Sequence, residues 1–396
     1  MIAALLALGL HVADAAERRF VPAQGARPAA ATAEHLAQGG TWPTRVQEGA
    51  RQLKARFEFV DWCRKGLEML YHRRYRDTRA LFTELQEEFP GTAVAPIADI
   101  LVWQAMMLEN FDFRYDAQYR TASALARTQL EAAAQTSGND GWEQFMLAGV
   151  VGLESIHGAR QGKYLPALTQ AFQALEHVSN VRAVAPDLVD LSLADGLYNY
   201  WRTALAQSSS LIPDFGDHRA EGIAQIIKVE DRGVFLGPPA TLSMVFTWLE
   251  EKDYDKALAS CLKNHAAYPD NVINELMTGM IRLKRQEHAA ALDVFDGILR
   301  LDRDNSRVHY LRGVALLRLT RLDEARQELE GYLGHDHLQT YQRGGAHWRL
   351  GEVYEKLGRF ADAELQYRAA EKLGINEAKV SLAKLREQKA SGQITW

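Results

Sequence analysis

The sequence predicts an all-α fold of stacked helix hairpins, and three regular spacings between residues 238 and 374 predict it. An alanine recurs at intervals of 34, 34 and 38 residues, a glycine precedes three of these alanines by twelve residues, and a larger side chain follows each alanine by four. The members are Ala257, Ala291, Ala325 and Ala363, then Gly279, Gly313 and Gly351, then Cys261, Phe295, Leu329 and Tyr367. A small residue where two helices touch, a glycine that faces it and a larger side chain one turn further on describe a helix hairpin, and this period indicates a repeat array.

The pattern resembles the tetratricopeptide-repeat family, in the form found in bacterial, exported proteins. The best match runs over residues 351–370, with further matches at 274–304, 313–332 and 241–269, the last with Val245 at the usual glycine position. The resemblance implies a right-handed α-solenoid of antiparallel helix pairs whose first helices line a concave face. Members of the family bind many kinds of partner, so the resemblance indicates the fold but not one particular function.

The first residues have the pattern of a secretory signal peptide. Residues 1–16 hold an apolar run that ends in Ala13-Asp14-Ala15, without a Lys or Arg ahead of it. The run is too short to span a bilayer. We expect a periplasmic or otherwise exported protein, with a cytoplasmic protein that begins in an apolar helix as the alternative. Residues 17–43, rich in Ala, Pro, Gln and Gly, are expected to be a disordered arm.

Degenerate repeats of the same kind are expected over residues 44–235. A first repeat ends at Pro90, which lies 24 residues after Gly66. An inserted loop is expected near residues 207–218, because Gly222 stands 14 residues beyond the place that the period from Gly196 would give. The repeats continue over 236–374, and a cap helix and tail fill 375–396. The count is about eight helix pairs and one cap helix.

Composition limits the classes of partner. The chain has 46 basic and 51 acidic residues, so no basic surface for nucleic acid is expected. No later stretch is long and apolar enough to cross a membrane, although peripheral association with a membrane complex stays open. The two cysteines, Cys63 and Cys261, fall within helical patterns and are expected to be packed thiols.

The sequence carries no recognised catalytic motif. It lacks the nucleophile, zinc-protease and calcium-loop patterns, so we expect no enzyme activity, no cofactor and no metal. Asp214, Asp217 and His218 in the expected loop form one candidate acid–base site. The favoured interpretation is instead that Asp217 caps the helix that follows.

The remaining candidate site is the concave lining. The resemblance places this lining three residues before and one residue after each repeat glycine. The eight positions are Leu242, Phe246, Leu276, Met280, Tyr310, Val314, Trp348 and Glu352. They lack the lysine, arginine and asparagine with which some members grip a peptide carboxylate. An apolar lining suits a helical or extended apolar segment anchored by Tyr310 and Trp348. The alternative is that other helices of the chain cover it.

The sequence therefore predicts a non-enzymatic scaffold or adaptor that binds a protein partner in this groove. The alternative is a carrier of a lipid or another apolar ligand inside the superhelix. That carrier would use Trp103, Met106, Met107 and the aromatic residues within Tyr198–Trp201.

Overall fold

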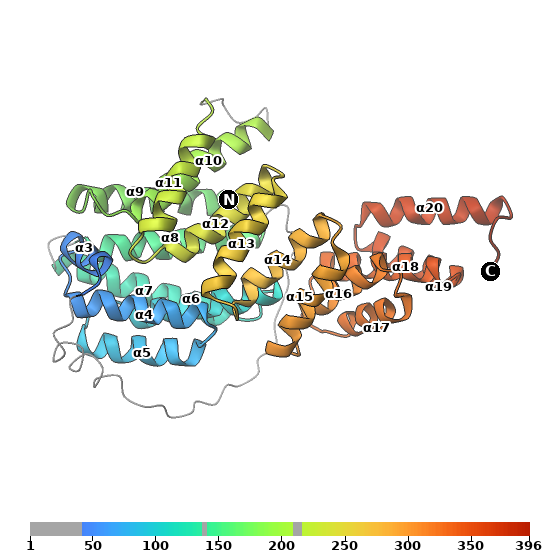
Figure 1. The fold of residues 1–396 in the computed structure, drawn as a ribbon, viewed down its shortest axis with the longest axis horizontal. Helices are drawn as coiled ribbons and strands as arrows, with labels where there is room; N and C mark the ends of the chain where they lie inside the picture. The colour runs from blue at the N-terminus through green and yellow to red at the C-terminus, as the bar shows by residue number, and fades with distance from the viewer. Residues whose placement is uncertain (1–41, 137–140, 209–215) are drawn as a thin grey trace. The chain divides into compact units, whose positions relative to one another are not determined.

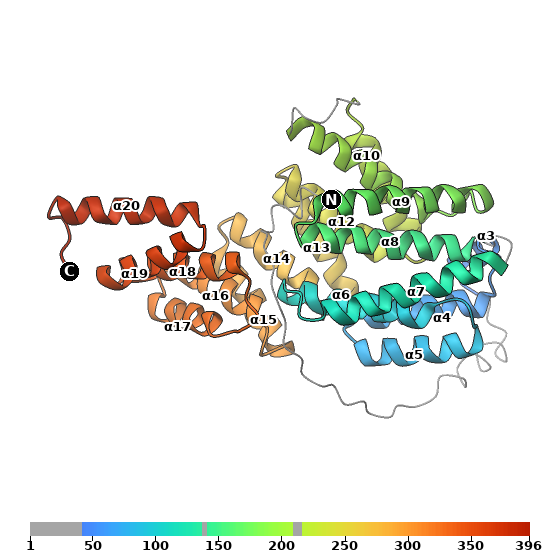
Figure 2. The ribbon, with the colours of Figure 1, turned by 180° about the vertical axis from the view of Figure 1, so that it is seen from behind.

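The computed structural model describes residues 42–136, 141–208 and 216–396, which contain 18 α-helices and no strand (Figures 1 and 2). The predicted all-α class is confirmed. The predicted signal peptide, nearly all of the predicted arm and the middle of the predicted loop lie outside the described residues. No described helix is both long enough and apolar enough to cross a membrane.

The helices follow one another with short connections. Their bounds are α3 Thr44–Gln52, α4 Phe57–Tyr71, α5 Tyr75–Glu88, α6 Val94–Asn110, α7 Asp116–Thr136, α8 Trp142–Arg160, α9 Tyr164–Val184, α10 Leu191–Ser208, α11 Arg219–Arg232, α12 Gly237–Glu250, α13 Tyr254–Ala267, α14 Val272–Lys284, α15 His288–Leu301, α16 Ser306–Arg318, α17 Leu322–Leu333, α18 Thr340–Lys356, α19 Phe360–Lys372 and α20 Asn376–Ala390. Seven successive pairs pack closely as hairpins: α4/α5, α8/α9, α10/α11, α12/α13, α14/α15, α16/α17 and α18/α19.

The described chain divides by packing into two units. The first unit holds residues up to Ala105 and Tyr115–Asn271, and the second holds Met106–Arg114 and Val272–Trp396. The last turn of α6 and the turn after it therefore belong to the second unit.

Small glycines allow the paired helices to touch. A Cβ atom on the first-helix glycine would lie within 2.7 Å of the side chain sixteen residues later, which is closer than atoms can approach. The pairs are Gly66 with Phe82, Gly279 with Phe295, Gly313 with Leu329 and Gly351 with Tyr367. The sequence pattern placed each glycine opposite the alanine twelve residues later, and the structure adds that the larger side chain one turn further on fills the space beside the glycine, in α4/α5 as well.

In the pair α12/α13 the larger residue of this contact lies on the first helix and the smaller one on the second. Val245 occupies the usual glycine position, and Cys261 stands sixteen residues later. Both side chains are fully buried, and both cysteines of the chain are buried free thiols as predicted. A larger residue on the first helix is thus matched by a smaller one on the second, which keeps the volume between the helices filled.

The backbones of α10 and α11 approach most closely where two glycines meet. A Cβ on Gly196 would lie 2.7 Å from the Gly222 carbonyl oxygen, and a Cβ on Gly222 would lie 2.7 Å from the Gly196 carbonyl oxygen. These are the two positions that the sequence pattern matched across the expected insertion. Part of that insertion lengthens α10, which continues to Ser208.

The core of the first unit joins helices that are distant in sequence. The Trp142 ring of α8 lies 4.7 Å from the Phe59 ring of α4 and 6.3 Å from the Phe235 ring. Asp190, which is buried, accepts hydrogen bonds from the backbone N–H groups of Phe235 and both its neighbours at 2.7–2.8 Å. This carboxylate fixes the turn that leads into α12, because it satisfies donors that would otherwise be buried without partners.

In the second unit, residues 106–114 cover the amino-terminal ends of α16 and α18. Asn305 Nδ2 donates to the Glu109 carbonyl oxygen at 3.2 Å, while its Oδ1 caps α16 by accepting from Val308 N at 3.0 Å. Gln342 Nε2 donates to the Phe111 carbonyl oxygen at 3.1 Å. These side chains therefore start a helix and also hold a segment from a distant part of the sequence.

Candidate functional site

The predicted lining falls on four first helices. Leu242 and Phe246 lie on α12 in the first unit, and the other six lie on α14, α16 and α18 in the second unit. Leu276 is fully buried, whereas the other seven side chains are half-buried. The second unit thus brings together Met280, Tyr310, Val314, Trp348 and Glu352 as partly exposed side chains on consecutive first helices.

Arginines hold the two predicted aromatic anchors in place. The Arg349 guanidinium lies 3.8 Å from the centre of the Trp348 ring, and Arg349 Nη1 donates to Glu352 Oε2 at 2.5 Å. Burial lowers the pKa of Arg349, but Glu352 and Tyr310 outweigh it and raise that pKa above its ordinary value. The Arg307 guanidinium lies 5.3 Å from the Tyr310 ring. Such cation–π contacts fix aromatic side chains without covering them fully.

Part of the predicted lining also packs within the chain. Trp348 Nε1 donates to Ser381 Oγ of α20 at 3.3 Å. The Tyr310 ring lies 5.3 Å from the Tyr332 ring. Phe246 packs against Tyr200 and its neighbours in the first unit. These residues therefore support neighbouring helices as well as presenting apolar surface.

Asp217 and His218 of the expected loop site lie at the start of α11 and make contacts with its first turn. Asp214 lies outside the described residues. Asp217 Oδ1 accepts from Arg219 N at 3.0 Å, and its Oδ2 accepts from Arg219 Nη2 at 2.7 Å. Hydrogen bonds from Arg219 lower the pKa of Asp217 to about 2. His218 Nδ1 lies 3.1 Å from Glu221 Oε2. Asp217 thus satisfies the first N–H of α11, as the capping interpretation predicts.

The residues named for an apolar carrier pack against their own neighbours. Trp103 stands between the Arg79 guanidinium and the Tyr115 ring, each 5.0 Å away. Met107 is fully buried, whereas Met106 is half-buried. Tyr200 and Trp201 are buried with their rings 5.0 Å apart, and the Tyr198 ring lies under the Arg202 guanidinium. The carrier alternative stays a prediction.

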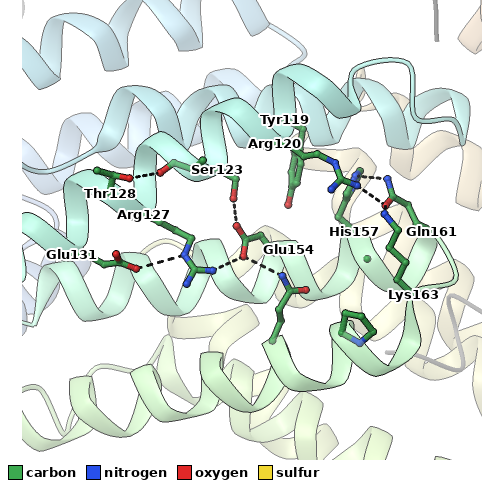
Figure 3. A pocket seen from close by; sticks show the side chains of 14 residues that line it. Tyr119, Arg120, Ser123, Arg127, Thr128, Glu131, Glu154, His157, Gln161 and Lys163 are labelled. Atoms are coloured by element: carbon green, nitrogen blue, oxygen red, sulfur yellow. Dashed lines mark hydrogen bonds and ion pairs between the residues drawn. The ribbon is translucent and has the colours of Figure 1, made fainter. Parts of the chain in front are cut away.

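A polar cavity of about 580 Å³ lies between α7, α8 and α9 of the first unit. Figure 3 shows Ser123 and Arg127 of α7 directed toward Glu154 of α8, with His157 one turn further along α8 and Gln161 just after the end of that helix. Glu154 accepts from Ser123 Oγ, from Arg127 Nη1 at 3.0 Å and from Gln170 Nε2 at 3.3 Å. One carboxylate thus joins three helices at this side of the cavity.

On the other side of the cavity a second carboxylate, Asp116, accepts hydrogen bonds from three side chains. It accepts from His157 Nε2 at 2.6 Å, Gln161 Nε2 at 2.7 Å and Arg120 Nε at 2.7 Å. Burial acts to raise the pKa of Asp116, but the hydrogen bonds from His157 and Arg120 hold it well below its usual range. Burial lowers the pKa of His157, so that imidazole is neutral and acts as a donor.

Tyr119 lines the same cavity from α7. Its side chain is 1% exposed, and its ring stacks on His157 with 4.3 Å between the ring centres. Within the described part of the chain, the Tyr119 hydroxyl has no hydrogen-bond partner. Burial, with a smaller effect of Glu154, raises the pKa of Tyr119, so the hydroxyl keeps its proton and can donate it.

Comparisons with known proteins agree with the hairpin geometry. A family model described as tetratricopeptide repeat matches residues 282–344. These residues, from the end of α14 to the start of α18, therefore carry the tetratricopeptide-repeat pattern. A crystal structure of the APC/C hetero-tetramer Cut9–Hcn1 is similar in fold, with a TM-score of 0.53, 13% identity, and coverage of 78% of this chain and 52% of that one. No match was found among curated proteins.

Two further solved structures are less similar. "MamA AMB-1 C2221" has a TM-score of 0.32 and 20% identity, and the match covers 44% of this chain and 96% of that one. A tetratricopeptide repeat protein from Parabacteroides merdae ATCC 43184 has a TM-score of 0.42 and 13% identity, with 71% of this chain and 98% of that one covered.

The repeat pattern in the sequence did not indicate the polar cavity. Its signal is a stripe of polar residues at helical spacing: Asp116, Arg120, Ser123 and Arg127 on α7, then Glu154 and His157 on α8 and Gln161 just after it. Residues three and four apart share one face of a helix, so both stripes face a single space. Apolar periodicity carries no signal for these polar faces.

Proposed function

We propose that this protein is a non-enzymatic scaffold whose first helices α14, α16 and α18 bind a helical or extended apolar segment of a protein partner. The observation that carries the proposal is the half-buried pair Tyr310 and Trp348, both held by arginines. Trp, Tyr and Arg are the residues that most often dominate binding free energy at protein interfaces. Side chains fixed before binding lose less conformational entropy when the partner arrives.

A site-specific crosslinking experiment tests this proposal. A photoreactive amino acid replaces Val314, which is half-buried on α16, or Leu365, which is 63% exposed on the second helix α19. We expect a crosslinked protein partner from position 314 and none from position 365 after illumination in cells. The covalent bond records which face the partner contacts, so the result does not depend on affinity during purification.

The matched substitution is Met280→Ala with Tyr310→Ala, compared with Leu365→Ala as the control. We expect the first variant to lose at least about tenfold in partner capture, because truncation of a central anchor typically costs more than 1 kcal/mol. Circular dichroism must first show that both variants are equally helical. Equal capture by both variants, or crosslinking from position 365 alone, would contradict the proposed face.

We also propose that the protein acts in the periplasm or elsewhere in the cell envelope. The support is the signal-like pattern of residues 1–16. Fractionation of cells that produce the full chain, followed by mass spectrometry of its amino terminus, tests this. We expect an envelope fraction and a start after Ala15 or Ala16, whereas a cytoplasmic protein that retains Met1 would contradict export.

A further inference from the structure

We propose that the cavity between α7, α8 and α9 is a binding site for a small organic molecule that carries a carboxylate. The cavity lies wholly in the first unit, so the proposal does not depend on the protein-binding face of the second unit. Its volume of about 580 Å³ is within the range of pockets that enclose small-molecule ligands, about 300–1,000 Å³.

Three residues with hydrogen-bond acceptors around the cavity, Glu154, Asp116 and Gln161, are already engaged. Glu154 accepts from three side chains, and Asp116 accepts from three others. Gln161 Oε1 accepts from Arg120 Nη2 at 2.9 Å and from Lys163 Nζ at 2.8 Å. A ligand that only donated hydrogen bonds would have to break these contacts, so the arrangement disfavours a cationic ligand.

Several hydrogen-bond donors around the cavity, in contrast, can each donate a further hydrogen bond. Lys163 Nζ uses one of its three protons on Gln161. Arg127 contacts Glu154 through Nη1 and Glu131 through Nε, which leaves Nη2 for a further acceptor. Tyr119 also lines the cavity, and its buried hydroxyl has no hydrogen-bond partner among the described residues. A carboxylate accepts about four hydrogen bonds and matches this surplus.

The local charge also favours an anion. The cations near the cavity outnumber the carboxylates: Arg120, Arg127, Arg160 and Lys163 against Asp116, Glu131 and Glu154. Lys163 is in addition the residue that precedes α9, a helix of 21 residues. The amino-terminal end of a helix carries partial positive charge, which adds to the attraction for an anion.

Binding of probe molecules to the full chain tests the inference. Ligand-observed NMR at constant ionic strength would measure succinate, its neutral diamide succinamide, and an acetylated Gly-Ala-Ala peptide with a free carboxylate. We expect succinate to bind and succinamide to bind at least about tenfold more weakly, because the charge-assisted hydrogen bonds are lost. The peptide separates a free small molecule from a carboxylate at the end of a protein partner.

Two substitutions locate the binding. Tyr119→Phe removes only the hydroxyl, and Lys163→Met removes one cation, while Lys228→Met on the exposed side of α11 is the control. We expect Tyr119→Phe and Lys163→Met each to weaken succinate binding by about fivefold or more, and the control to leave it unchanged. Tyr119→Phe should keep the melting temperature of the wild type, because no described side chain bonds to that hydroxyl.

Each other outcome overturns the inference. If succinate does not bind, or binds equally to the Tyr119→Phe and Lys163→Met variants, the cavity is not a carboxylate site. Equal binding of succinamide would show that charge is not recognised. Binding of the peptide without succinate would assign the cavity to a protein terminus instead of a free small molecule.

Discussion

At the scale of single residues, packing between paired helices depends on one glycine. In α14/α15 the Phe295 ring occupies the space where a Gly279 side chain would stand. The same glycine is a poor helix former, so the chain accepts a local cost of roughly 0.5–1 kcal/mol to allow close contact. The packing between Gly279 and Phe295 must therefore stabilise the helix pair by more than the helix propensity that an alanine at position 279 would add.

We predict that Gly279→Ala lowers the free energy of unfolding by about 1–3 kcal/mol, because the added methyl group overpacks the contact with Phe295. The matched control is Gly297→Ala on α15, where the nearest atom to an added Cβ is Arg300 Nη2 at 3.5 Å. That substitution should raise the free energy of unfolding by about 0.5–1 kcal/mol. Thermal unfolding followed by circular dichroism measures both, and an equal sign for both changes would contradict the packing argument.

At the scale of elements, each helix pair needs a neighbour to cover its apolar face. The helix α20 does this for α19: Ala378, Leu382 and Leu385 are buried, while Val380 is 70% exposed. Charged residues occupy most of the remaining surface of α20. One apolar face and one polar face are what a terminal helix of a repeat stack requires.

We predict that removal of residues 375–396 lowers the stability of the second unit. Exposure of the two buried leucines of α20 should lower the free energy of unfolding by about 3–6 kcal/mol. This is an upper value, because the unfolded chain also buries some apolar surface. The destabilisation should appear as a lower melting temperature and as self-association in light scattering. Val380→Ser should leave both measurements unchanged, since that side chain is exposed. An unaltered melting temperature after truncation would refute the role of α20.

At the scale of the whole molecule, residues far apart in sequence share one unit. Residues 106–114 pack with the repeats that begin at Val272. Hydrogen bonds from Asn305 and Gln342 to backbone carbonyls of this segment join positions 196 and 231 residues apart. The second unit is therefore incomplete when it consists of consecutive repeats alone.

We predict that Gln342→Ala destabilises the full chain more than it destabilises a protein of residues 272–396. The difference should be about 0.5–1.5 kcal/mol, the usual net contribution of one hydrogen bond, because the shorter protein lacks the Phe111 carbonyl. The loss of the helix-capping contact to Gln339 is common to both and cancels in the comparison. An equal cost in the two proteins would show that the segment adds nothing to this unit.

The sequence by itself determined the helices and their pairing. Gly279, Gly313 and Gly351 lie at the hairpin contacts where the repeat spacing placed them, because helical periodicity and a short turn fix which faces of two consecutive helices meet. The capping role of Asp217 followed for the same reason, since its partner lies two residues away.

Only the tertiary structure decided which of those faces are covered and by what. The repeat pattern placed Leu276 on the predicted concave lining, but the neighbouring side chains bury it completely. The packing of residues 106–114 depends on side chains from helices that are far apart in sequence, and the cavity around Tyr119 depends on how α7, α8 and α9 converge. The repeat pattern records which faces of paired helices meet, whereas these contacts depend on how further helices converge on a pair, so the repeat pattern alone did not indicate them.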